Sequence, residues 1–160
     1  MALSILKHKV RKSQRGQSLV ELAISLPVMV LILLGTVDFG MAIFTYSILR
    51  DAAQEGALYG SFNPGNKSEI EIRARNISPR GEEDVFSSPI QLRDKDHIKV
   101  NVKTIGDACQ GFTNGISNSI QVSVSYNYPI LMPFLGQVIG AKTIQLNGVA
   151  TNMILQPPCP

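Results

Sequence analysis

The chain has 160 residues, 44% of them hydrophobic, and a formal net charge of +3 at pH 7. This length suits one domain with an additional segment. The first 16 residues hold five basic residues and no acid, so the other 144, with ten basic and twelve acidic residues, carry a net charge of −2. A nucleic-acid-binding protein needs a basic patch on its folded body, and we therefore expect no nucleic-acid partner.

A long apolar run follows the basic head. It extends from Leu22 to Phe44, and Asp38 is its only formal charge. About 20 apolar residues span a bilayer as a helix, and membrane helices tolerate interruptions such as Pro27 and Gly35. Positive charges before such a run favour a cytoplasmic N-terminus. The sequence therefore predicts a single-pass membrane protein whose remaining residues lie in the periplasm or at the cell surface. The five basic residues are Lys7, Lys9, Arg11, Lys12 and Arg15.

The apolar run continues without a turn signal into an alanine-rich stretch. A cleaved signal peptide would have a shorter apolar core of about 7–15 residues. The first strong helix breakers are Gly60 and the segment 63–65. We therefore expect one helix from about Ser18 to Tyr59, roughly 60 Å long at 1.5 Å per residue. Its second half would stand above the bilayer.

The remaining residues predict a small α+β head. Residues 66–77 indicate a short amphipathic helix, capped by Asn66 or Ser68, with a strand as the alternative. Residues 97–104 and 119–126 alternate apolar and polar side chains, as half-buried strands do. A third alternating segment, 142–155, has a break at Gly148. We expect antiparallel strands packed on the stem of the long helix. The inward residues would be Ile70, Ala74, Ile77, Ile98, Val100, Val102, Ile120, Val122, Val124 and Tyr126, and the third segment alternates at Ile144 and Leu146.

The start of the long helix carries a family resemblance. Its first residues read G-Q-S-L-V-E, from Gly16 to Glu21, after a basic leader. This pattern resembles the leader of type IV pilins and pseudopilins. The stretches V-E-L-A-I-S-L-P, G-T-V-D-F-G and D-A-A-Q-E-G-A-L-Y are similar to the TadE-like minor pseudopilins of the tight-adherence (Flp, type IVb) pilus system. The later V-S-V-S-Y-N-Y-P resembles a strand of that family. Positions that depart from the family are Leu22, Asp38, Gln54 and Leu58.

The resemblance implies a pilin-like protein with three parts. These are a leader at 1–16, a transmembrane and stem helix at 17–60, and an extracytoplasmic α+β head at 61–160. A prepilin peptidase would cut between Gly16 and Gln17. The implied function is non-catalytic support of pilus assembly, without a cofactor. The implied partners are the inner membrane, the prepilin peptidase, pilin and other minor pseudopilin subunits, and the inner-membrane machinery of the tight-adherence system.

Two carboxylates are candidates for helix packing and register. After cleavage Glu21 would be the fifth residue, where it can pair with the Gln17 amine of an adjacent subunit, because a buried carboxylate needs a partner. The alternative is a boundary carboxylate in contact with lipid headgroups. Asp38 is an ionisable residue inside an apolar run, which favours a functional role. Its alternative is a position at the outer headgroup edge.

No set of residues indicates catalysis or a metal site. Asp94, Asp96 and His97 lack a calcium-loop spacing and are typical of a polar turn before a strand. Cys109 and Cys159 can form one disulfide, and only outside a reducing cytosol. Two rival hypotheses remain open. One is an uncleaved, signal-anchored binding domain, and the other is an anchored hydrolase with its site in the head.

Overall fold

The computed structural model describes residues 15–75, 90–109, 112–113, 116–132, 136–137 and 140–156. Its contacts divide the chain into two compact units, residues 1–37 and 38–160. One helix, α1, runs from Arg15 to Phe62 and contributes to both. The predicted long helix is therefore confirmed, and it extends three residues beyond the expected limits at each end.

The first unit contains the N-terminal half of α1. Every described side chain from Gly16 to Val37 is exposed, except that Gly35 is half-buried. Pro27 lies inside the helix without ending it. This half of α1 makes its helix from local hydrogen bonds alone and contributes no buried side chain to a core.

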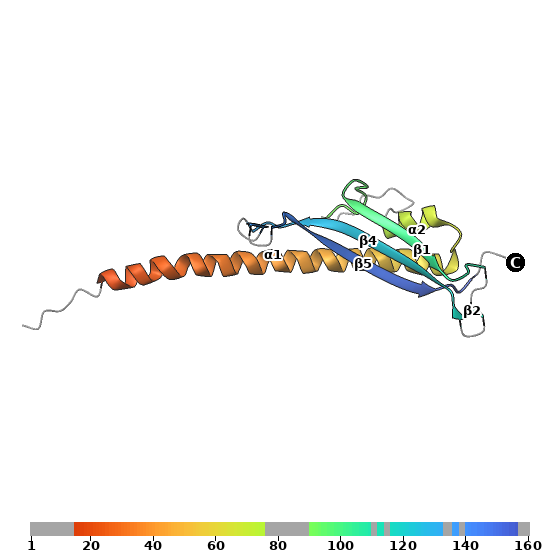
Figure 1. The fold of residues 1–160 in the computed structure, drawn as a ribbon, viewed down its shortest axis with the longest axis horizontal. Coiled ribbons are helices and arrows are strands. Elements are labelled where there is room, and N and C mark those ends of the chain that lie inside the picture. The colour runs from red at the N-terminus through yellow and green to blue at the C-terminus, as the bar shows by residue number, and fades with distance from the viewer. Residues whose placement is uncertain are drawn as a thin grey trace, which may run out of the picture. The chain divides into compact units, whose positions relative to one another are not determined.

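The second unit is built on a three-stranded antiparallel sheet in the order β1-β4-β5. β1 covers Ile98–Ile105, β4 covers Ser119–Pro129 and β5 covers Thr143–Met153 (Figure 1). A separate short hairpin pairs β2, Phe112–Thr113, with β3, Ile116–Ser117. The α+β class and the predicted antiparallel strands are confirmed, and the long N-terminal helix followed by a small sheet is a pilin-like arrangement.

A short helix, α2, covers Lys67–Ala74. The Asn66 side chain accepts a hydrogen bond from the backbone N–H of Glu69 at 3.2 Å, which is a typical N-cap. The helical prediction is thus confirmed here, and the strand alternative is wrong. Ile70 and Ala74 are buried as expected, whereas Ile77 lies outside the described residues.

The helix α2 is fixed to the sheet by one buried arginine. The Arg75 guanidinium donates to the backbone carbonyls of Leu92 at 3.1 Å and Ile98 at 3.2 Å. It also pairs with the Glu71 carboxylate, 3.0 Å away. A buried guanidinium needs such partners because desolvation of an unpaired charge is costly. Arg75 therefore connects the end of α2 to the start of β1.

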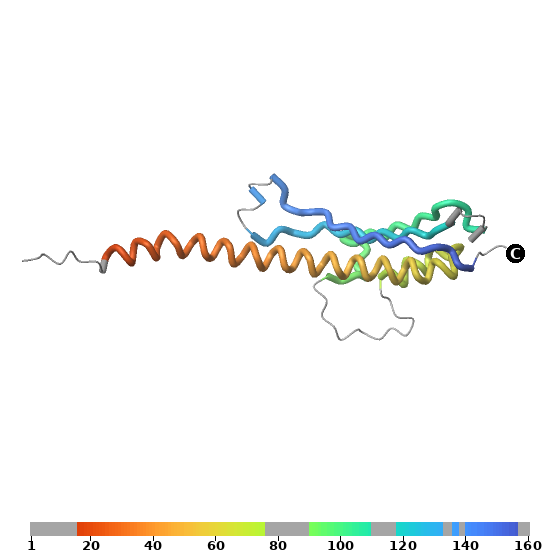
Figure 2. The backbone as a smooth tube through the Cα atoms, turned by 90° about the horizontal axis from the view of Figure 1, so that it is seen from below, coloured from red at the N-terminus to blue at the C-terminus, as the bar shows by residue number. Residues whose placement is uncertain are grey.

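One face of the sheet packs against α2 and the C-terminal half of α1 (Figures 1 and 2). The helix contributes mostly small side chains, so the sheet can approach its backbone closely. A Cβ added at Gly56 would lie 2.8 Å from the Ala74 Cβ, and one at Gly60 would lie 2.7 Å from Ile120. The buried apolar core contains Leu49, Ala52, Ala53, Ala57, Ile70, Ala74, Ile90, Ile98, Ile120, Val122 and Val124.

The expected break at Gly148 is wrong, because β5 runs through this residue without interruption. Gly148 pairs with Val124 in the middle of the β4–β5 ladder. A Cβ there would overlap the carbonyl group of Leu49 and lie 2.5 Å from the backbone nitrogen of Arg50. Glycine is therefore needed for close contact between β5 and α1, not for a turn.

Candidate functional site

The N-terminal half of α1 is an apolar surface without an internal partner among the described residues. Its large side chains are exposed on all sides of the helix. Its hydroxyl groups bond within the helix: Thr36 donates to the carbonyl of Ile32 at 2.8 Å and Ser25 to that of Leu22 at 3.3 Å. The hydrocarbon core of a bilayer offers no hydrogen-bond partners, so polar groups that lie in it must bond within the protein. In the described part of the chain, α1 is the one helix long and apolar enough to cross a membrane, which suggests single-pass anchoring.

The residues of the expected cleavage motif begin α1. Gly16, Gln17 and Glu21 are all exposed. A Cβ at Gly16 would meet no described atom within 4 Å. Nothing within the described chain therefore requires a glycine there. Cleavage after Gly16 and a register role of Glu21 stay predictions.

Asp38 is buried, with 7% of its surface exposed, and it is held by the second unit. The Tyr128 hydroxyl donates to Asp38 Oδ1 at 2.9 Å. The backbone N–H of Met132 donates to Oδ2 at 3.3 Å. Asp38 thus fastens the end of β4 to α1. Glu21 lies 17 positions earlier on the helix, so the two carboxylates do not form one site.

Tyr128 is the hydrogen-bond partner of Asp38 that sequence reasoning missed. It lies 90 positions after Asp38, and strand periodicity does not reveal which helix residue a strand end contacts. Burial raises the pKa of Tyr128 to about 12, and the hydrogen bond to Asp38 and the negative charge of Asp38 act in the same direction. One signal was available: an ionisable residue inside an apolar run needs a polar partner.

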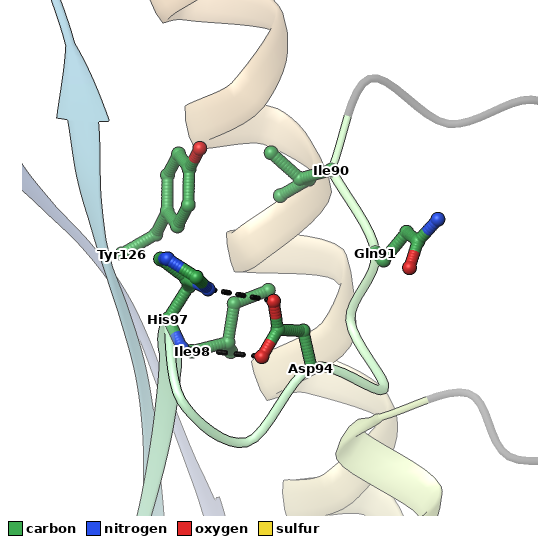
Figure 3. A pocket seen from close by; sticks show the side chains of 6 residues that line it. All are labelled: Ile90, Gln91, Asp94, His97, Ile98 and Tyr126. Carbon is green, nitrogen blue, oxygen red and sulfur yellow. Dashed lines mark hydrogen bonds and ion pairs between the residues drawn. The ribbon is translucent and has the colours of Figure 1, made fainter.

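The turn before β1 forms the second polar cluster. Asp94 Oδ1 accepts hydrogen bonds from the backbone N–H groups of Asp96 and His97, and Oδ2 contacts His97 Nδ1 at 2.7 Å. Figure 3 shows the His97 ring directed at the Asp94 carboxylate. The hydrogen bond with the His97 ring, followed by that with the Asp96 N–H, lowers the pKa of Asp94. The predicted polar turn before a strand is present.

The hollow beside this turn is small. It is lined by Ile90, Gln91, Asp94, His97, Ile98 and Tyr126 and has a volume of about 220 Å³ (Figure 3). Pockets for small molecules usually measure about 300–1,000 Å³. Among the described residues, no group of three or more His, Cys, Asp and Glu side chains is placed to hold a metal. The Asp94–His97 pair is best explained as a turn that starts β1.

The expected disulfide is described at one end only. Cys109 lies in the turn after β1, where its backbone N–H donates to Asp107 Oδ1 at 2.9 Å. The backbone N–H of Asp107 in turn donates to Asn118 Oδ1 at 2.8 Å. Cys159 lies outside the described residues. The Cys109–Cys159 pair therefore stays a prediction.

A long N-terminal apolar helix followed by a small antiparallel sheet is the arrangement of the pilin-like class, and the apolar helix suggests membrane anchoring. Within this class, residues 16–58 match the family model described as TadE-like protein. The family resemblance is therefore confirmed over most of α1, and the match includes none of the sheet. The match suggests a protein associated with the tight-adherence pilus. No curated protein and no solved structure matches the chain.

Proposed function

We propose that the protein is a minor pseudopilin that supports assembly of a Flp-type pilus and performs no catalysis. One observation carries the proposal: the part of α1 that matches the TadE-like family starts with Gly16 and exposes only one acid, Glu21, before Asp38. A helix with this surface needs lipid or other apolar helices around it. The N-terminus would lie in the cytoplasm and the head outside, as the leader charges favour.

Processing would change the helix end in a specific way. Cleavage after Gly16 removes all five basic leader residues and leaves a new amine on Gln17. The shortened chain can then move from the bilayer toward a bundle of subunit helices without carrying those charges. A prepilin peptidase, pilin subunits and the tight-adherence inner-membrane machinery would be its partners.

Glu21 would set the register of the helix in the bundle. Its side chain is exposed in the isolated chain, so it is available to another subunit. In a low-dielectric bundle a lone carboxylate is unfavourable, whereas one that pairs with an amine can be accommodated. The Gln17 amine of an adjacent subunit is the proposed partner, and misaligned neighbours would leave both charges unpaired.

The first experiment tests processing through pilus formation. Gly16→Val should abolish cleavage and fibre assembly in the native cell, because the peptidase must approach this backbone closely. Gly40→Val is the matched control, since neither position has a described atom within 4 Å of a Cβ. Chain length by immunoblot and fibre counts by microscopy are the two readouts. Normal fibres from Gly16→Val would overturn the proposal and favour an uncleaved, signal-anchored binding domain.

A second experiment tests the register role. Glu21→Gln keeps the side-chain shape and removes the charge, so it should leave cleavage intact and reduce incorporation into fibres. Ser25→Ala, an exposed polar change four positions later, should leave both unchanged. Equal incorporation of both variants would refute the pairing of Glu21 with Gln17. An enzymatic activity retained by residues 38–160, the second compact unit, would instead support the anchored hydrolase.

A further inference from the structure

The second unit has an apolar surface at the end where Asp38 is held. We define the β4–β5 end as residues 130–132 and 140–144, the described residues on either side of the β4–β5 connection. Leu131 is 63% exposed and Ile144 is also exposed. The two sides are joined by a hydrogen bond from the Ile130 N–H to the Lys142 carbonyl at 3.1 Å. Leu131 and Ile144 are thus exposed at the same end of the unit.

The same unit exposes apolar side chains of α1 just after Asp38. Phe39 is 69% exposed, and Met41, Ile43 and Phe44 are also exposed. These residues complete the apolar run that starts at Leu22. The hydrogen bonds of Tyr128 and Met132 to Asp38 bring the β4–β5 end to this part of the helix. The exposed apolar side chains of α1 after Asp38 and those of the β4–β5 end therefore lie at the same end of the unit.

The number of α1 residues needed to cross a membrane determines how deep the β4–β5 end would lie. About 20 residues are needed to cross the hydrocarbon core. Counted from Leu22, they end near Met41, beyond Asp38. A boundary at Phe44 would place Asp38 about 9 Å inside it, at 1.5 Å per residue. With a span that starts at Leu22, the β4–β5 end, which is bonded to Asp38, would lie at or below the outer boundary of the bilayer.

We propose that the β4–β5 end enters the outer surface of the lipid bilayer beside α1, with Leu131 and Ile144 in contact with lipid. This inference rests on the proposed membrane insertion of α1. The carboxylate of Asp38 is then covered by the Tyr128 hydroxyl and the Met132 N–H instead of facing hydrocarbon. Both α1 and the β4–β5 end then contact the membrane, so the orientation of the head relative to the bilayer is fixed.

The charge at the β4–β5 end agrees with contact between this end and lipid. Lys142 is the only charged residue after Asp107 in the chain, and it is exposed at the β4–β5 end. A long cationic side chain next to apolar residues can reach phosphate groups while its stem stays in the interface. Anionic headgroups attract such a residue. A lipid surface therefore fits this end better than a charged protein surface does.

The opposite end of the sheet provides a control. Leu155 is 60% exposed, and its N–H donates to the carbonyl of Ser61 at 2.8 Å. Ser61 follows Asp38 by 23 residues on α1, which corresponds to about 35 Å along the helix. Leu131 and Leu155 therefore have similar exposure at opposite ends of the unit. Lipid should contact only Leu131.

Single tryptophan residues can test this, because the chain has no tryptophan of its own. The full chain would carry Leu131→Trp, Leu155→Trp or Leu33→Trp and be reconstituted in vesicles of phosphatidylethanolamine and phosphatidylglycerol. Leu33 is exposed within the apolar half of α1 and reports insertion of the helix. Each variant would be measured with ordinary lipid and with lipid brominated on its acyl chains, and circular dichroism would verify the fold.

The expected result is loss of fluorescence with brominated lipid for Leu33→Trp and Leu131→Trp, and unchanged fluorescence for Leu155→Trp. Loss for Leu33→Trp alone would overturn this inference and leave the anchoring intact. No loss for any variant would refute membrane insertion of α1 itself, and with it the proposed function. A blue-shifted but unquenched Leu131→Trp would mean that protein covers this end. A loss of fluorescence for Leu155→Trp equal to that for Leu131→Trp would indicate that the head adsorbs to the membrane without a fixed orientation. Either of these last two results would contradict the proposal.

Discussion

The N-terminal and C-terminal halves of α1 use side chains of different size for different purposes. From Gly16 to Val37 the exposed residues are mostly large and apolar, and they contribute nothing to an internal core. From Asp38 to Phe62 a stripe of mostly small residues is buried against the sheet and α2. The stripe comprises Asp38, Thr45, Leu49, Ala52, Ala53, Gly56, Ala57, Gly60 and Ser61.

The difference shows how one continuous helix can serve two environments. Large apolar side chains suit contact with lipid or with other helices, where shape is set by the partner. Small side chains let a sheet approach the helix axis, so that a short head obtains a core from few residues. The change occurs at Asp38, which is the first residue of α1 described as buried and is hydrogen-bonded to Tyr128 of the head.

The largest expected effect is a difference in the free energy of unfolding between alanine variants at two leucines of α1. Leu49→Ala should lower the free energy of unfolding by about 2–5 kcal/mol, because it leaves a cavity in a packed core. Leu33→Ala should change it by less than about 0.5 kcal/mol in detergent, since its side chain is exposed. Urea unfolding of the full chain in micelles measures both. Similar losses from the two variants would remove the distinction between the halves.

Two glycines, one buried between β5 and α1 and one exposed on α1, provide the second comparison. Gly148→Ala should destabilise by about 1–3 kcal/mol or more, because its Cβ would collide with α1 backbone that cannot move aside. Gly40→Ala meets no described atom within 4 Å and should stabilise the helix by up to about 1 kcal/mol. The same unfolding assay applies. A stable Gly148→Ala variant would mean that β5 does not lie against α1 as described.

The contact at the boundary of the two halves should contribute less. Tyr128→Phe removes the donor to Asp38 Oδ1 and should cost about 1.5–3 kcal/mol, the range for hydrogen bonds to charged groups. Tyr126→Phe on the same strand is the matched control and should cost less. If Asp38→Ala, which removes the acceptor, abolishes the effect of Tyr128→Phe in a double-mutant cycle, the two side chains act together. Additive losses would contradict that coupling.

The pH dependence of the same contact is the smallest effect. The pKa of Tyr128 is raised from 10.0 to about 12, so the folded state keeps its proton where the unfolded state loses it. Stability from this group is complete below pH 10 and is lost as pH rises through 12. Absorbance titration should show a tyrosine with this late transition, absent in Tyr128→Phe. A titration unchanged by Tyr128→Phe would argue against the Asp38 contact.

Local pattern predicted most of the fold but none of its long-range contacts. The helix α1 and the strands β1 and β4 follow from runs and alternation that are visible in a short window. The Asp38–Tyr128 hydrogen bond joins residues 90 positions apart, and no local pattern contains that information. Gly148 was predicted as a break because glycine usually interrupts strands, whereas here the neighbouring α1 backbone requires it. Glycine is needed at position 148 because of a tertiary contact, which becomes visible only in the packed structure.

Intact mass of the protein from its native cell, with and without the prepilin peptidase, tests the central claim most directly. The account predicts a chain that begins at Gln17 when the peptidase is present and retains the residues before it when the peptidase is absent. A chain that keeps the leader through Gly16 in both strains would contradict it. The exposed half of α1 would then be the anchor of an uncleaved membrane protein, and the function would have to be sought in residues 61–160.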